Sequence, residues 1–251
     1  MPENSVRRRI FVALGVVALS AGLWGCGSNE PPPQATPEDD LGTPTTLLLE
    51  SPVGAVDAGV YASKVSGAAL REGLALDVRE VDGARDATEL LEAGRADAAI
   101  MGIDDFGRAR ENGVGLVGIG AIVQPNPKTL PGEPDTRPEE PYPAVILVTS
   151  EDRLERDPET IETLIAVLDE GYSDVIADPE GGLGALLIYK PSLDGDRERT
   201  RLDRLLRDGA FVPPLQLDRR EVATWIGSAV RRDVLREPID VEEAFRFDLD
   251  G

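Results

Sequence analysis

The pattern of apolar and polar residues over 91–124 predicts the centre of an α/β fold. A helix is expected to end at Gly94, because glycine suits the left-handed position that follows a helix. The short apolar run 98–101 is typical of a strand covered on both faces, and 116–123 is a second run of this kind. A tight turn and a helix ending near Gly113 are expected between them. The stretch therefore predicts helix, strand, helix and strand in close succession.

The residues before this stretch extend the alternation towards the N-terminus. Residues 45–49 form a β-branched and aliphatic run that predicts a strand, and 74–81 alternate apolar and polar residues as a half-buried strand does. Helices are expected over 58–66 and 86–93. Repeated strands and helices with short connections favour a mainly parallel sheet with helices on both faces. The expected fold class is therefore α/β.

A stretch rich in proline and acidic residues, 125–141, divides the expected fold. It lacks apolar periodicity, so an exposed connection is expected there. A further strand follows over 142–150, and Asp157 and Pro158 then open an amphipathic helix. Three more helices are expected, at 179–189, 197–207 and 218–230.

Three loops are expected to meet at one edge of this sheet, at 50–57, 82–86 and 102–105. Each loop follows the carboxyl end of a predicted strand. In an open α/β sheet, ligands lie outside these ends. The loops are therefore the first candidate for a binding site.

Four residues of these loops are candidate ligand contacts on their own chemistry. Asp104 and Asp105 offer hydrogen-bond acceptors to a cationic or polar solute, or alternatively cap the helix that follows them. Gly83 and Gly102 allow backbone amides to approach a solute, or alternatively form turns. Catalysis by the two aspartates is not expected, because adjacent residues rarely face one substrate from both sides.

Composition excludes several classes of function. The chain of 251 residues carries 26 basic and 47 acidic residues, and this formal charge of −21 argues against a nucleic-acid partner. It contains no histidine, which excludes Ser-His-Asp and Cys-His nucleophile systems and any imidazole metal site. A single cysteine rules out an internal disulfide. We therefore expect neither an enzyme nor a bound cofactor or metal.

The N-terminus has the pattern of an export signal. Three successive arginines precede the apolar run 10–19, which is too short for a comfortable membrane span. The segment ending at Cys26 resembles the lipobox of bacterial lipoproteins, with Leu23 and Gly25 at the usual positions and Trp24 as a bulky departure. The resemblance implies lipidation of Cys26. An uncleaved anchor helix or a free thiol is the alternative.

The residues after Cys26 predict a tether, because 27–43 consist mainly of Pro, Gly, Ser, Asn and acidic residues and cannot form a core. The expected location is the outer face of the cytoplasmic membrane, with the membrane contacted through the lipid on Cys26.

Several sequence segments of the folded part resemble one protein family. They are Leu49 and Glu50 through Gly59 to Ala62, Glu72 to Leu74, Leu91 to Ile100, Val117 to Gln124, Asp218 to Trp225 and Val241 to Phe245. In this order and spacing the chain resembles the substrate-binding lipoproteins of ABC importers for nitrate, sulfonates and thiamine-pyrimidine precursors. The resemblance implies a periplasmic-binding-protein-like fold, a small-molecule solute and an ABC permease in the membrane as partners.

The resemblance also implies that Glu50, Ser51 and Asp57 occupy ligand-loop positions, with a turn and an N-cap as the alternative. The pyrimidine-precursor branch has a tryptophan and a histidine in this region. Here those places hold Ser51 and Asp57, so aromatic stacking and the imidazole are absent. This departure weakens a pyrimidine assignment.

A second departure concerns the size of the chain. The family places a second α/β lobe between the strand ending near Gln124 and the strand starting near Tyr142, where this chain has only 125–141. We therefore expect a single binding lobe with its C-terminal helices. The expected division is a signal peptide at 1–25, the lipidated cysteine and tether at 26–43, the first α/β part at 44–124, a linker at 125–141, and the return strand and C-terminal helices at 142–251.

Two functions follow as hypotheses. The first is an exported, lipid-anchored solute-binding protein of an ABC importer that captures a small polar solute without covalent chemistry. The second is a single-lobe surface lipoprotein that binds a protein partner and no longer carries a solute. An exposed apolar patch at the edge left by the second lobe would favour the second hypothesis.

Overall fold

The computed structural model describes residues 42–50, 52–124, 142–211 and 213–249. All of them belong to one compact unit of the chain. The predicted signal peptide, Cys26, most of the tether, Ser51 and the linker at 125–141 lie outside the described residues.

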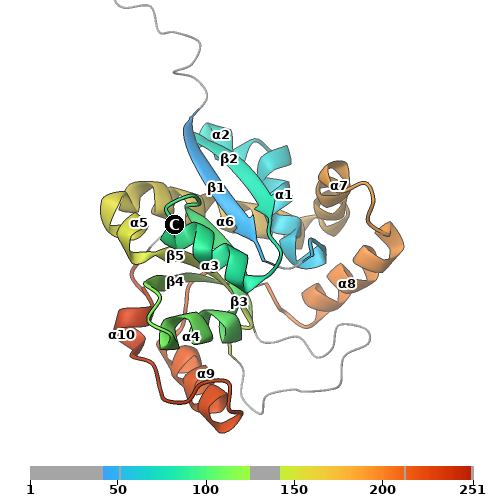
Figure 1. The fold of residues 1–251 in the computed structure, drawn as a ribbon. Helices are drawn as coiled ribbons and strands as arrows, with labels where there is room; N and C mark the ends of the chain where they lie inside the picture. The colour runs from blue at the N-terminus through green and yellow to red at the C-terminus, as the bar shows by residue number, and fades with distance from the viewer. Residues whose placement is uncertain (1–41, 51, 125–141, 212, 250–251) are drawn as a thin grey trace, which may run out of the picture. The chain divides into compact units, whose positions relative to one another are not determined.

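Five strands form one mixed sheet (Figure 1). They are β1 (Thr43–Leu49), β2 (Leu74–Glu80), β3 (Ala98–Gly102), β4 (Leu116–Val123) and β5 (Val145–Ser150). Their order across the sheet is β2-β1-β3-β5-β4, with β1 parallel to β2 and β3 and with β5 antiparallel to β3 and β4. The α/β class is confirmed, but the sheet is mixed where a mainly parallel one was expected, because β5 is antiparallel to both of its neighbours. Because Val145 at the start of β5 pairs with Val123 at the end of β4, β5 has to run in the opposite direction.

The helices are η1 (Ala55–Asp57, a single 3-10 turn), α1 (Ala58–Val65), α2 (Ala68–Arg71), α3 (Ala84–Glu92), α4 (Ile103–Glu111), α5 (Glu151–Arg156), α6 (Pro158–Ala177), α7 (Pro179–Tyr189), α8 (Gly195–Arg207), α9 (Arg219–Arg231) and α10 (Val241–Ala244). They cover both faces of the sheet, as expected. One apolar core joins the sheet to α1, α2, α6, α7 and α8, and a second joins it to α3, α4, α9 and α10. Among the described helices, none combines the length and the hydropathy required to cross a bilayer.

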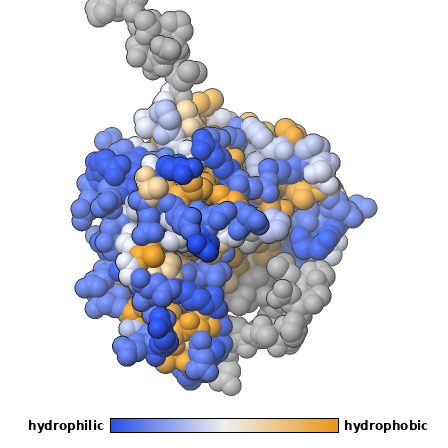
Figure 2. Space-filling view, in the orientation of Figure 1, coloured by the Kyte–Doolittle hydropathy of each residue, from blue (hydrophilic) through white to orange (hydrophobic). Residues whose placement is uncertain are grey.

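Aspartate side chains cap the N-termini of several C-terminal helices. Asp157 accepts a hydrogen bond from the backbone N–H of Thr160 at the start of α6, and the aspartates that precede α7, α8, α9 and α10 act in the same way. Such caps satisfy amides that have no partner within the helix. The starts of α6, α7 and α9 agree with the expected ones, whereas α8 begins two residues earlier than expected because Asp194 caps it, and α10 was not expected as a helix. Figure 2 shows mainly hydrophilic residues on the surface over α3 and α8.

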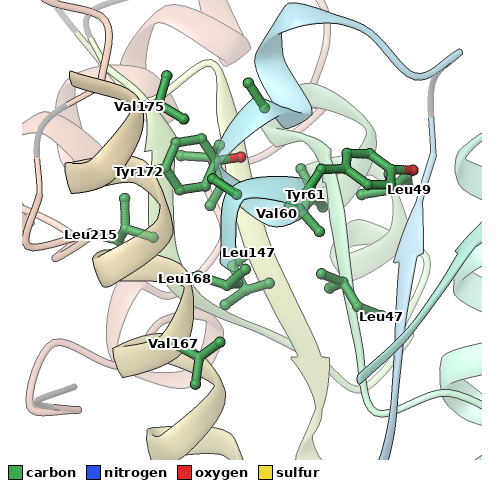
Figure 3. Packing of buried hydrophobic residues seen from close by; sticks show 14 of the residues in the cluster. Leu47, Leu49, Val60, Tyr61, Leu147, Val167, Leu168, Tyr172, Val175 and Leu215 are labelled. Atoms are coloured by element: carbon green, nitrogen blue, oxygen red, sulfur yellow. The ribbon is translucent and has the colours of Figure 1, made fainter. Parts of the chain in front are cut away.

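The packing of α6 on α1 positions the N-terminal end of α1. Leu168 and Tyr172 of α6 point towards Leu147 of β5 and Val60 of α1 (Figure 3). The hydroxyl of Tyr172 donates a 2.9 Å hydrogen bond to the carbonyl of Val56 in η1, just ahead of α1. Tyr172 of the core therefore fixes the position of the segment between β1 and α1.

Glycine allows this close contact between the two helices. A Cβ on Gly171 of α6 would lie 2.2 Å from the backbone oxygen of Gly59 in α1. We expect Gly171→Ala to lower the free energy of unfolding by about 2 kcal/mol, because backbone has to move to make room. Urea unfolding would measure this loss.

Gly184 supplies a matched control, because it lies inside α7 and a Cβ added there would meet no heavy atom within 4 Å. Gly184→Ala is expected to stabilise the protein by about 0.5–1 kcal/mol through helix propensity. Equal effects of the two substitutions would contradict the close α1–α6 contact.

Candidate functional site

A cavity of about 360 Å³ lies beyond the carboxyl ends of β1 and β3. Its wall combines acidic groups, one guanidinium and apolar side chains. It is formed by Glu50, Pro52, Gly54, Ala55, Val56, Asp57, Ile100, Met101, Gly102, Asp105, Val145, Arg201 and Leu205. This is the position at which open α/β sheets bind ligands.

The sheet brings loops distant in sequence to this cavity. The N–H of Glu50, just after β1, donates a 3.2 Å hydrogen bond to the carbonyl of Ile100 in β3. Val145 pairs with Gly102 because β5 starts at the edge where β3 ends. Parallel pairing of β1 with β3 thus places the loops that follow them side by side.

Glu50 is a buried carboxylate in this wall, with 9% of its surface exposed. Its Oε2 accepts a 3.0 Å hydrogen bond from the N–H of Gly102, at the start of α4. Burial raises the pKa of Glu50 from 4.5 to about 7; the hydrogen bond from Gly102 opposes this rise, and the nearby carboxyl of Asp105 adds to it. Asp105 lines the cavity too and pairs with Arg108 at 2.7 Å.

Two further carboxylates meet at the N-terminus of η1. The N–H of Gly54 donates to Asp57 at 2.9 Å, and the N–H of Ala55 donates to Glu198 of α8 at 2.8 Å. A Cβ on Gly54 would lie 2.9 Å from an oxygen of Glu198, so a larger residue would displace this carboxylate. Glu198 is 3% exposed and also accepts a 2.9 Å bond from Arg201. The helix end is therefore neutralised by carboxylates of the chain itself.

Asp57 does not cap α1 with its side chain; it folds back to the N–H of Gly54. Burial raises the pKa of Asp57 from 3.8 to about 7, the bond from Gly54 opposes the rise, and the charges of Glu80 and Glu198 add to it. Asp57 is 7% exposed and lines the cavity. A negative charge at this position is thus costly to the folded protein.

These shifts predict how stability depends on pH. Because the folded state binds the protons of Glu50 and Asp57 more tightly than the unfolded chain, their contribution favours folding at low pH and is lost as pH rises from about 4 to about 7. We expect Glu50→Gln to be more stable than the wild type at pH 8 by about 2 kcal/mol, and to lose most of this advantage at pH 5. Urea unfolding at both pH values measures the difference. An exposed control, Glu162→Gln, should show no such dependence, and an identical pH slope in Glu50→Gln and wild type would contradict the burial of a charge.

The structure brings four of the seven predicted ligand residues to one cavity. Glu50, Asp57, Gly102 and Asp105 line it, and Ser51 lies outside the described residues. Gly83 and Asp104 are not part of its wall. Gly83 has φ of +95° at the turn before α3, which fits the alternative of turn formation.

Asp104 faces away from the cavity towards the C-terminal helix α9. It accepts hydrogen bonds from Trp225 Nε1 at 2.8 Å and from the guanidinium of Arg232 at 3.0 and 3.1 Å. Burial acts to raise the pKa of Asp104, but the bonds from Arg232 and Trp225 outweigh it and the pKa is lowered. Neither Asp104 nor Asp105 caps α4, whose N-cap residue is Gly102 without a side-chain bond.

The residues of α8 were missed by the prediction of the site. Glu198, Arg201 and Leu205 approach the loop after β1 from 143 residues further along the chain, as the bond from Ala55 to Glu198 shows. One signal was present in the sequence. Glu198 shares a helix face with Leu202 and Leu205, and a carboxylate on an apolar face indicates a buried partner. Within the described part of the chain, no three potential metal-ligating side chains gather.

Comparison with known proteins supports the resemblance. Residues 56–137 match the family model described as NMT1/THI5 like. No curated protein matches the chain significantly.

Solved structures share the fold at low sequence identity. A Candida albicans gene product described as having the generic periplasmic binding protein fold matches with a TM-score of 0.64 at 11% identity, over 84% of this chain and 98% of that one. The periplasmic aliphatic sulphonate binding protein of Escherichia coli matches with a TM-score of 0.59 at 12% identity, over 80% and 91%. The periplasmic nitrate-binding protein of Synechocystis matches with a TM-score of 0.62 at 11% identity, over 83% and 87%. The chain thus has the periplasmic-binding-protein fold and, over residues 56–137, resembles the NMT1/THI5 like family.

Proposed function

We propose that this protein is the solute-binding component of an ABC importer and captures a small polar solute without covalent chemistry. The observation that carries the proposal is the cavity of about 360 Å³ at the carboxyl ends of β1 and β3, in a fold shared with proteins named for binding nitrate and sulphonate. Cavities of this size with a few polar groups among apolar walls are typical of small-molecule sites. The similarity to binding proteins agrees with the expectation that the chain is not an enzyme.

Export and anchoring are part of the proposal and rest on the sequence alone. Cys26 would carry the lipid, and the tether after it would hold the folded unit at the outer face of the cytoplasmic membrane, within reach of the permease. The described residues begin at residue 42, beyond Cys26.

We further propose that one lobe performs the capture. All strands of the described residues belong to one sheet, and β4 passes to β5 through only 125–141. A solute at the carboxyl ends of these strands would be covered from the α8 side by Arg201 and Leu205. Since closure of two lobes buries most of a solute in a clamshell protein, a single lobe is expected to bind with lower affinity.

Thermal unfolding of the full-length protein in detergent tests capture directly. The panel contains amines, amino acids, thiamine precursors, sulfonates and nitrate. A ligand present at a hundredfold excess over its dissociation constant should stabilise the folded state by about 2.7 kcal/mol. A reproducible shift that Asp105→Ala removes would place binding in this cavity, whereas the absence of a shift with every solute would contradict the proposal.

Binding of a protein partner in place of a solute is the alternative. It predicts an exposed apolar patch beside the cavity, at the edge where a second lobe would sit. The large exposed apolar side chains of the described residues are Val65, Leu70, Ile176, Ile188 and Tyr189. They belong to α1, α2, α6 and α7, and none of them lines the cavity. This distribution favours solute capture over a partner docked at the cavity.

A further inference from the structure

Helix N-termini that face a cavity normally offer free backbone amides to anions. Two such ends border this cavity, at η1 followed by α1 and at α4. Here the amides are already bonded within the chain. Gly54 donates to Asp57, Ala55 donates to Glu198 and Gly102 donates to Glu50, at 2.9, 2.8 and 3.0 Å. An anionic solute would therefore have to displace a carboxylate of the protein at each of these positions.

The charge of the wall also opposes an anion. Glu50, Asp57 and Asp105 line the cavity, and among the described residues the guanidinium that lines it, that of Arg201, is bound to Glu198. Like charges at close range repel more strongly in a partly desolvated site than in water. A cation entering the cavity would instead find carboxylates on two sides, from the loop after β1 and from α4.

Two of these carboxylates retain acceptor capacity towards the cavity. Glu50 and Asp57 are each more than nine-tenths buried and line it. A carboxylate has about four acceptor positions. Asp57 receives one backbone hydrogen bond, from Gly54, and Glu50 receives one, from Gly102, beside its side-chain contact with the Asp105 carboxyl. Buried carboxylates that lack hydrogen-bond donors are costly unless a ligand supplies them. A solute that carries N–H donors could bond to the remaining acceptor positions.

The remaining wall is apolar. Its apolar side chains come from four elements: Val56 from η1, Ile100 and Met101 from β3, Val145 from β5 and Leu205 from α8. Such a surface favours a hydrocarbon or aromatic body over a small hydrated ion. Charge and apolar surface thus lie together in one cavity.

Resting on the proposed function, we propose that the cavity takes an organic cation, an ammonium or amidinium group attached to an apolar body, and excludes the small anions that proteins of this fold are named for binding. The cationic N–H groups bond to Glu50, Asp57 and Asp105. The apolar body packs against Val56, Val145 and Leu205.

The test compares ligands that differ mainly in charge, by calorimetric titration of the full-length protein in detergent at pH 8. 2-Phenylethylamine is the cation, 2-phenylethanol its neutral analogue, and ethanesulfonate and nitrate are the anions. We expect the amine to bind at least tenfold more tightly than the alcohol and the anions to give no heat of binding. Asp105→Asn should lower the affinity for the amine at least tenfold and leave the affinity for the alcohol unchanged. The control Asp86→Asn lies on an exposed helix start away from the cavity and should change neither affinity.

The outcomes separate this inference from the proposed function. Binding of nitrate, ethanesulfonate or the alcohol in preference to the amine would overturn the ligand class and leave solute capture standing. Failure of all four ligands, together with no thermal shift across the wider panel, would overturn both. Amine binding that Asp105→Asn does not weaken would also overturn the inference, because the cation would then lie elsewhere.

Discussion

Glu198→Ala is expected to lower the free energy of unfolding by about 3 kcal/mol. Glu198 is 3% exposed and accepts the hydrogen bond of the Ala55 N–H, while its other oxygen holds Arg201. Removing one partner of a buried ion pair leaves the other charge uncompensated, and this commonly costs about 3–5 kcal/mol. The Nε of Arg201 is already buried without a partner among the described residues, so the guanidinium has little alternative bonding.

The same variant should create an anion site. With the carboxylate gone, the N–H of Ala55 and the guanidinium of Arg201 both point into the vacated space, a combination that binds small anions. Formate or nitrate at high concentration is expected to restore part of the lost stability in Glu198→Ala and to leave the wild type unchanged. Urea unfolding with and without the anion, against chloride at equal ionic strength, measures the rescue.

Two variants serve as controls for Glu198. Glu198→Gln keeps an acceptor for Ala55 and should lose less stability without responding to formate. Glu162→Ala removes an exposed glutamate of α6 and should change stability by less than about 0.5 kcal/mol. If Glu198→Ala lost no more stability than Glu162→Ala, or if no anion restored its stability, the carboxylate of Glu198 would not occupy an anion-binding position.

Asp104→Ala and Asp105→Ala are expected to have opposite consequences, although the residues are neighbours. Asp104 accepts from the indole of Trp225, which is fully buried, and from Arg232. Its loss leaves a buried N–H and a guanidinium without their acceptor, so we expect stability to fall by about 3 kcal/mol. Solute affinity should remain within about twofold, because Asp104 does not line the cavity.

Asp105→Ala removes a half-exposed ion pair with Arg108, and such pairs contribute about 0–1 kcal/mol. Burial is the main cause of the raised pKa of Glu50, and the substitution removes the carboxyl that adds to this rise, so the net loss of stability should be small. It also removes a carboxylate from the cavity wall, so solute binding should weaken at least tenfold. Urea unfolding and titration on the same two proteins check both expectations. A loss of affinity in Asp104→Ala at unchanged stability would reverse the roles assigned to the two aspartates.

Local sequence patterns were sufficient to predict most of the helices and strands of the fold. The apolar run of β1 predicts a strand, and those of β3 and β4 predict covered strands. The starts of α6 and α9 are predicted because Asp157 and Asp218 bind backbone amides within their own helix. These features act over a few residues, which is why periodicity and capping chemistry reveal them. The position of the candidate site followed from the general rule that parallel strands end at one edge.

The roles of single side chains depended on the tertiary structure. Asp104 and Asp105 have the same chemistry in the sequence, and only the direction of each side chain from α4 decides that one holds Trp225 and the other lines the cavity. Glu198 reaches Ala55 across 143 positions of the chain, a contact that no local spacing encodes. The antiparallel direction of β5 was likewise decided by where the chain re-enters the sheet. The sequence by itself thus determined the elements and the edge that carries the site, because these depend on local patterns. Which carboxylates are buried, paired or free was decided by packing between distant segments.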